Sequence, residues 1–173
     1  MNKLFKLLCF AINVIAYVAL LTVAPRSILT ILVGLPIAIW FTNAVHEASH
    51  LIAYVALRIR WTRFSFSYWT IIRDTEGTSV KFDMNSGIYN ACCTCIYDAG
   101  VPLWKYWVAL LSGGVLCAIM GAVCLLLCSF VEGALWSLMG CIGVAFVLNA
   151  AGNLLIPFSP DRTLLKMIVK DRR

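Results

Sequence analysis

The chain has 173 residues, is 62% hydrophobic and has a mean hydropathy of +0.90. Because a soluble domain is about 45–50% apolar, this composition excludes an ordinary soluble domain and predicts an integral, multi-pass membrane protein. The net charge of +6 does not indicate nucleic-acid binding, since the basic residues flank the apolar segments, where they set orientation and contact lipid headgroups. We therefore predict one membrane-embedded domain, residues 1–173, with the lipid bilayer as a partner.

Four apolar segments are each long enough to cross a bilayer, which takes about 20 apolar residues. They cover residues 4–24, 28–57, 106–130 and 133–156. The first segment could be mistaken for a signal peptide because Lys3 and Lys6 lie at its start, but its length and the Ala24-Pro25 sequence favour a retained helix. The sequence predicts an all-α polytopic membrane protein with about four transmembrane helices.

Basic residues flank the four segments unevenly. Thirteen of the 14 Lys and Arg residues lie before or at the start of the first segment, in the loop 58–105, or after the fourth segment. Only Arg26 lies elsewhere, between the first and second segments. The positive-inside rule then places both termini and the loop 58–105 in the cytoplasm.

An H-E-x-x-H motif, His46-Glu47-Ala48-Ser49-His50, lies in the last third of segment 28–57 and contains both histidines of the chain. Residues four apart share one helix face, so His46 and His50 can bind one metal ion. Glu47 is placed to act on a metal-bound water as a general base. The alternative is an incidental pair of histidines, which is disfavoured because a His-Glu-His cluster in hydrocarbon is costly without a function.

The loop 58–105 differs in composition from the rest of the chain. Residues 61–69 are aromatic with partial alternation, residues 74–77 form a turn signal, and residues 78–83 alternate again, which predicts a small β-hairpin near the membrane. The role of Cys92, Cys93 and Cys95 stays open between packing, lipidation and metal contact. Their predicted cytoplasmic side argues against disulfides, and no second cysteine cluster completes a four-ligand zinc set.

A hydrolytic zinc site uses three protein ligands and one open position for water. With no histidine left, Asp161 is the best candidate for the third ligand, because it follows the fourth segment at the predicted cytoplasmic end. Pro157 and Pro160 break the helix and allow the chain to turn toward the motif. Of the polar residues in the spans, Asn149 is expected to bond between helices, and Asn43, one turn before Glu47, is a candidate neighbour of the site.

Taken together, these motifs resemble the site-2 proteases, which are intramembrane zinc metalloproteases. Members carry H-E-x-x-H on one transmembrane helix and, two helices later, an Asn- and Pro-rich motif that ends in Leu-Asp-Gly. The family's Asn lies eight residues before its Asp, as Asn153 and Asp161 do here. Pro160 and Arg162 replace the family's Leu and Gly, and Ser112-Gly113-Gly114-Val115 has Val where the family has Pro.

The resemblance implies hydrolysis of peptide bonds in or near transmembrane segments of membrane-inserted substrates, near the cytoplasmic face. It implies that His46, His50 and Asp161 hold Zn²⁺, that Glu47 is the catalytic base, and that Asn153 orients substrate or stabilises the developing oxyanion. It also implies β-structure that approaches the site. The predicted hairpin then either binds extended substrate along a strand edge or anchors the chain at the interface through its aromatic residues.

Two other functions remain open. One is a metal-binding transporter or sensor without proteolysis, in which Glu47 matters less than the ligands. The other is a catalytically inactive protease relative that acts as a binding partner. Pro160 and Arg162, which differ from the family motif on either side of Asp161, leave this alternative open.

Overall fold

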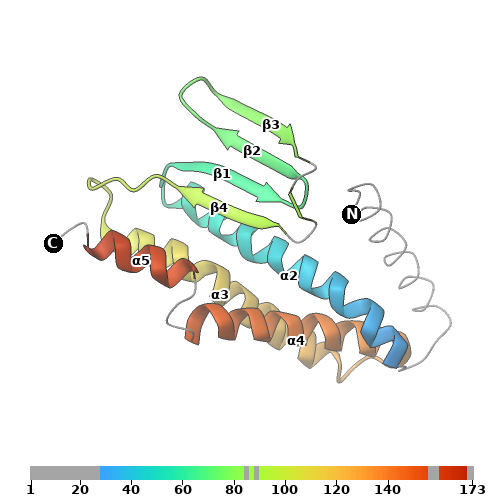
Figure 1. Cartoon of the computed structure of the whole chain (residues 1–173). Coiled ribbons are helices and arrows are strands. Elements are labelled where there is room, and N and C mark those ends of the chain that lie inside the picture. The colour runs from blue at the N-terminus through green and yellow to red at the C-terminus, as the bar shows by residue number, and fades with distance from the viewer. Residues whose placement is uncertain (1–27, 84–85, 88–89, 156–159, 171–173) are drawn as a thin grey trace.

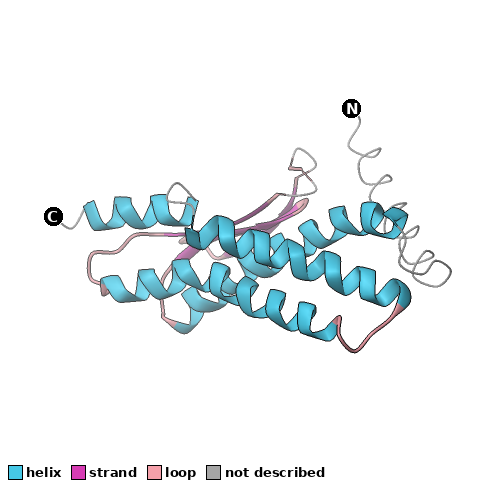
Figure 2. Cartoon of the chain, turned by 90° about the horizontal axis from the view of Figure 1, so that it is seen from below, coloured by secondary structure: helices cyan, strands magenta, loops and turns pink. Residues whose placement is uncertain are grey.

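A computed structural model of the chain describes residues 28–83, 86–87, 90–155 and 160–170. It contains four helices, α2 (Ile28–Ala56), α3 (Leu103–Leu127), α4 (Gly133–Leu155) and α5 (Pro160–Lys170), and four strands, β1 (Trp61–Phe66), β2 (Trp69–Arg73), β3 (Thr78–Phe82) and β4 (Ala91–Cys95). The long helices α2, α3 and α4 pack against one another, and the strands lie to one side of them (Figures 1 and 2). The predicted first span, residues 4–24, lies outside the described residues.

The three long helices follow the predicted apolar segments closely. Continuous apolar sequence favours helix because every backbone N–H and C=O is then bonded within the segment. α2 continues through Pro36 and ends before Arg58, whose backbone is left-handed with φ of 57°. Among the described residues, two helical stretches are long and apolar enough to cross a membrane, Leu103–Leu127 and Leu135–Leu155.

The predicted fold class, all-α with a small hairpin, is wrong because the strands form a four-stranded antiparallel sheet in the order β3-β2-β1-β4. The predicted aromatic strand is split by a tight turn in which Ser67 adopts a φ of 55°. The turn at Asp74 joins β2 to β3. Asp74 Oδ1 accepts hydrogen bonds from the backbone N–H groups of Glu76 and Gly77. The three-cysteine segment forms β4, which pairs with β1 and leaves β4 as an edge strand.

Helix α5 is a second departure from the sequence prediction, in which Pro160 only ends a helix. Pro160 instead opens a new one, where a fixed φ and a missing N–H cost nothing. Asp161 in its first turn and Lys170 in its last turn complement the helix dipole. Its apolar residues Leu165 and Ile168 are buried against Tyr54 of α2 and Tyr106 of α3. Burying each such side chain stabilises the folded state by about 1.5–3 kcal/mol. This packing holds α5, and with it Asp161, against the long helices.

Candidate metal centre

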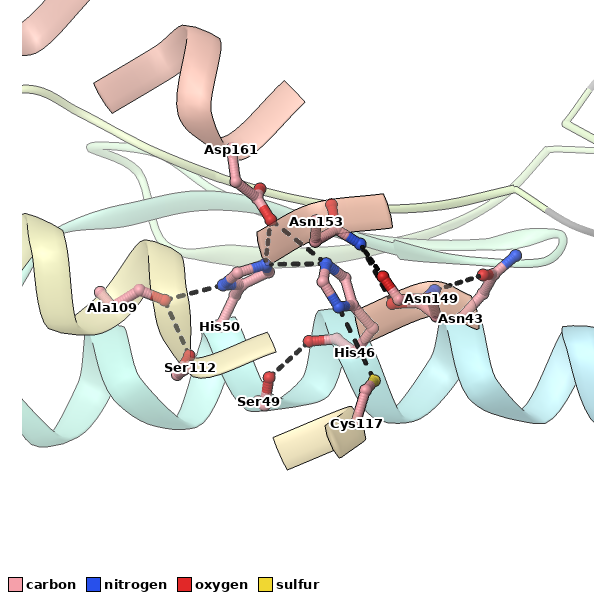
Figure 3. Close-up of polar contacts among 10 residues, drawn as sticks. All are labelled: Asn43, His46, Ser49, His50, Ala109, Ser112, Cys117, Asn149, Asn153 and Asp161. Carbon is pink, nitrogen blue, oxygen red and sulfur yellow. Dashed lines mark hydrogen bonds and ion pairs between the residues drawn. The ribbon is translucent and has the colours of Figure 1, made fainter. Parts of the chain in front are cut away.

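His46, His50 and Asp161 converge at one point between α2 and the start of α5 (Figure 3). The Nε2 atoms of the two histidines are 3.2 Å apart. Asp161 Oδ2 lies 3.3 Å from His46 Nε2 and 3.4 Å from His50 Nε2. The helical i, i+4 spacing places both imidazoles on one face of α2, and the docking of α5 brings the carboxylate to them. These three side chains can hold a metal ion.

The centre is buried and has an unsatisfied acceptor. His46 and His50 are 5% and 2% exposed. Asp161 Oδ2 is also buried and has no hydrogen-bond partner of good geometry, although it faces both Nε2 atoms. Burial by itself would raise the pKa of Asp161, but its contacts with the two imidazoles hold that pKa well below its usual range. The carboxylate is therefore ionised and directed at the position where a cation is needed.

The ring of His50 is oriented by the backbone of α3. His50 Nδ1 lies 2.8 Å from the carbonyl oxygen of Ala109, which can only accept, so Nδ1 carries the proton and Nε2 keeps its lone pair. Ser112 Oγ donates to the same carbonyl oxygen at 2.7 Å. On the other ring, His46 Nδ1 is 3.8 Å from Cys117 Sγ. Such contacts are typical of histidines that bind metal through the opposite nitrogen.

Gly113 is the point at which α3 approaches the two histidines. A Cβ atom at this position would lie 2.5 Å from His46 Cε1 and 2.7 Å from His50 Nε2. No real Cβ contact is that short, so any side chain here would displace the rings. Gly113 therefore makes room for the cluster itself, whereas a Cβ at Gly114 would meet Leu154 of α4 and marks close helix packing.

Glu47 lies beside the three converging groups, half-buried on α2. Its carboxylate is within hydrogen-bond range of the backbone amide of Cys93 in β4. The three-cysteine segment thus brings an edge strand to the site, which its sequence did not indicate. Burial raises the pKa of Cys93 to about 12 and keeps it a neutral thiol near pH 7. In the described part of the chain, the group of potential metal ligands contains no cysteine.

Three asparagines form a hydrogen-bonded ladder next to the cluster (Figure 3). Asn153 Nδ2 donates to both the backbone oxygen and Oδ1 of Asn149, each at 3.1 Å. Asn149 Nδ2 in turn donates to Asn43 Oδ1 at 3.3 Å. The bond between Asn149 and Asn43 joins α4 to α2, as expected for Asn149. The ladder also places Asn43 in a network that reaches Asn153, the residue that the family resemblance implicates.

Comparison with known proteins adds no relative, because no protein-family model, curated protein or solved structure matches the chain.

Proposed function

We propose that the chain is an intramembrane zinc metallopeptidase, which hydrolyses peptide bonds in or near transmembrane segments of membrane-inserted proteins. The observation that carries this proposal is the convergence of two imidazole nitrogens and one carboxylate oxygen with Glu47 beside them. Two nitrogens and one oxygen are typical of catalytic zinc sites, in which the fourth position stays open.

The spacing of the three ligand atoms supports zinc. Tetrahedral ligands about 2.0–2.1 Å from zinc lie about 3.3 Å from one another. The three observed separations are 3.2, 3.3 and 3.4 Å. A cation between them also satisfies Asp161 Oδ2, which otherwise stays buried and unpaired. Zinc held there by His46, His50 and Asp161 would supply a Lewis acid to polarise the scissile carbonyl and acidify the attacking water.

Glu47 performs the proton transfers in this proposal. Its carboxylate takes a proton from the attacking water and passes it to the leaving amine. It is suited to this role because it is adjacent to the ligands in sequence and is not among the converging ligand atoms. The backbone amide of Cys93 lies within hydrogen-bond range of this carboxylate.

The edge of β4 gives the site a surface for an extended substrate. The backbone oxygen of Asn90 and the amide of Ile96 both bond toward the β1 side of the strand. Because backbone groups alternate along a strand, those of Ala91, Cys93 and Cys95 point to the free edge. This is the edge beside Glu47, whose carboxylate takes the Cys93 amide. A peptide that adds here as another strand would therefore pair with the remaining edge groups.

Strands β2 and β3, at the other end of the sheet from β4, suit the other role predicted for the loop, which is to anchor the chain at the membrane interface. Trp69, Val80 and Phe82 on β2 and β3 are 50–62% exposed. Exposed aromatic residues such as Trp69 and Phe82 are favoured at the interface between lipid and water. In our proposal the β4 edge receives substrate, and these residues anchor the sheet at the cytoplasmic surface. The centre then lies below that surface, since His50 precedes Arg58 by eight residues, or about 12 Å along a helix.

The proposal is tested with purified protein in lipid nanodiscs and a panel of fluorogenic membrane-spanning peptides. We expect cleavage that 1,10-phenanthroline abolishes and added Zn²⁺ restores. Zinc uptake into sealed vesicles without cleavage of any peptide would support a transporter instead. Bound zinc with neither cleavage nor uptake would support an inactive relative.

A further inference from the structure

A groove of about 310 Å³ runs between α2 and α4 on the side of the asparagine ladder. Its walls are mostly apolar, with a few polar groups at the ladder. The lining residues are Leu35, Ile39, Thr42, Asn43, Ala145, Leu148 and Asn149. The groove therefore shares Asn43 and Asn149 with the asparagine ladder, and Asn149 is bonded in turn to Asn153.

Thr42 has an unused hydrogen-bonding group in this groove. The residue is 2% exposed, and its Oγ1 has no hydrogen-bond partner among the described residues. A buried, unpaired hydroxyl destabilises the folded protein. Threonine back-bonding to its own helix would remove much of that cost, but the described structure shows no such bond. The hydroxyl is thus suited to bind a group that enters the groove.

One backbone oxygen fixes the direction of the whole asparagine ladder. The carbonyl oxygen of Asn149 can only accept, so Asn153 must present its NH₂ group there and to Asn149 Oδ1. Asn149 must then present its own NH₂ to Asn43, which accepts through Oδ1. The NH₂ group of Asn43 consequently points away from the ladder, as Figure 3 shows. Asn43 lines the groove, and the ladder leaves its NH₂ group as the donor that the ladder itself does not use.

The ladder also constrains Asn153. Its NH₂ group is directed at two acceptors of Asn149, and an oxyanion needs a donor. The NH₂ group is therefore engaged within the ladder, which disfavours the stabilisation of an oxyanion by Asn153.

We propose that the groove between α2 and α4 binds the locally unwound, apolar membrane segment of the substrate, with Thr42 and Asn43 donating hydrogen bonds to its freed peptide carbonyls. This inference rests on the proposed protease function. A helix that unwinds in an apolar medium exposes carbonyl oxygens that must find donors. Apolar walls with one hydroxyl and one amide offer those donors while they accommodate the side chains of the segment.

The test uses the full chain with Glu47→Gln, which is expected to bind substrate without turnover. The probe is a synthetic peptide of about 21 Leu and Ala residues, interrupted centrally by Asn-Pro and labelled with a fluorophore. Peptide affinity is compared for Thr42→Val, which removes the hydroxyl at constant shape, and Thr42→Ser, which keeps the hydroxyl. We expect Thr42→Val to weaken binding about tenfold and Thr42→Ser to restore most of it.

A matched control is available on α4. Ser137 is 1% exposed and its Oγ also lacks a partner in the described structure, but it does not line this groove. Thr42→Val and Ser137→Ala should both leave thermal stability unchanged or raised, because each removes an unpaired buried hydroxyl. Only Thr42→Val should weaken peptide binding. Unaltered affinity in Thr42→Val, or weaker binding in Thr42→Ser than in Thr42→Val, would overturn the proposal.

A photoreactive amino acid at Leu148 identifies the occupant directly. We expect crosslinks to the added peptide. Crosslinks to residues 4–24 of the same chain that the peptide does not displace would show that the groove holds the chain's own first apolar segment, and would overturn the proposal. The unaltered protein could cleave no peptide while Thr42→Val weakens peptide binding and Thr42→Ser restores it. In that case the protease function fails and the groove remains a peptide-binding site.

Discussion

Glu47→Gln should lower peptide hydrolysis at least about 10²-fold while the protein still binds its metal. General-base catalysis contributes about 10²–10⁴-fold to rate, and glutamine cannot take a proton from water. The substitution preserves shape, and the glutamine side-chain oxygen can still accept from the Cys93 amide. The three converging ligand atoms come from other residues, so metal content should stay unchanged. The measurement is kcat for a membrane peptide together with zinc per chain.

Glu76→Gln is the matched control for this result. Glu76 is an exposed residue of the turn between β2 and β3, where its backbone amide, and not its carboxylate, makes the turn bond to Asp74. Its substitution should leave cleavage unaltered. Cleavage by Glu47→Gln at the unaltered rate would remove Glu47 from the mechanism and favour a role for the centre in metal binding alone.

Gly113→Ala should weaken metal binding at least about 10–100-fold, which is the range seen when the support of a metal ligand is lost. A single methyl group at Gly113 would approach His46 Nδ1 and His50 Nε2 to 2.7 Å each. Both rings must then move, and the 3.2 Å separation of their Nε2 atoms cannot be kept. The measurement is the zinc dissociation constant by competition with a chromogenic chelator.

Gly140→Ala separates this effect from a general response of the helices. A Cβ at Gly140 of α4 would have nothing within 4 Å, and alanine is the better helix former by about 1 kcal/mol. This variant should bind zinc normally and be slightly more stable. Normal zinc affinity in Gly113→Ala would contradict the close approach of α3 to the histidines.

The candidate ligands could be predicted from sequence because helical periodicity places His46 and His50 on one face, whatever the rest of the fold does. Asp161 could be proposed because the chain has no third histidine and because the apolar segments indicated which ends meet. That reasoning did not reveal how Asp161 is held. The spacing of Leu165 and Ile168 on α5 carried that signal, but the two prolines before them suggested only a broken helix.

The sheet was harder to predict than the helices. β4 pairs with β1 across about 25 intervening residues, and strand pairing depends on partners that local sequence does not specify. The cysteines of β4 show no polar–apolar alternation. Their segment therefore suggested a reactive or metal-binding role and gave no sign of a strand. Its contact with Glu47 depends on that long-range pairing. Likewise, the spacing of Asn149 and Asn153 indicates a shared face of one helix, but only the packing of α2 on α4 joins Asn43 to them.

Zinc per purified chain, measured by mass spectrometry for the unaltered protein and for Asp161→Ala, tests the three-ligand centre most directly. Asp98→Ala, at an exposed site away from the cluster, serves as control. We expect about one zinc in the unaltered protein and in the control, and much less in Asp161→Ala, because two imidazoles alone leave the ion under-coordinated. Full zinc in Asp161→Ala, or no zinc in the unaltered protein after reconstitution with Zn²⁺, would contradict a centre built from His46, His50 and Asp161.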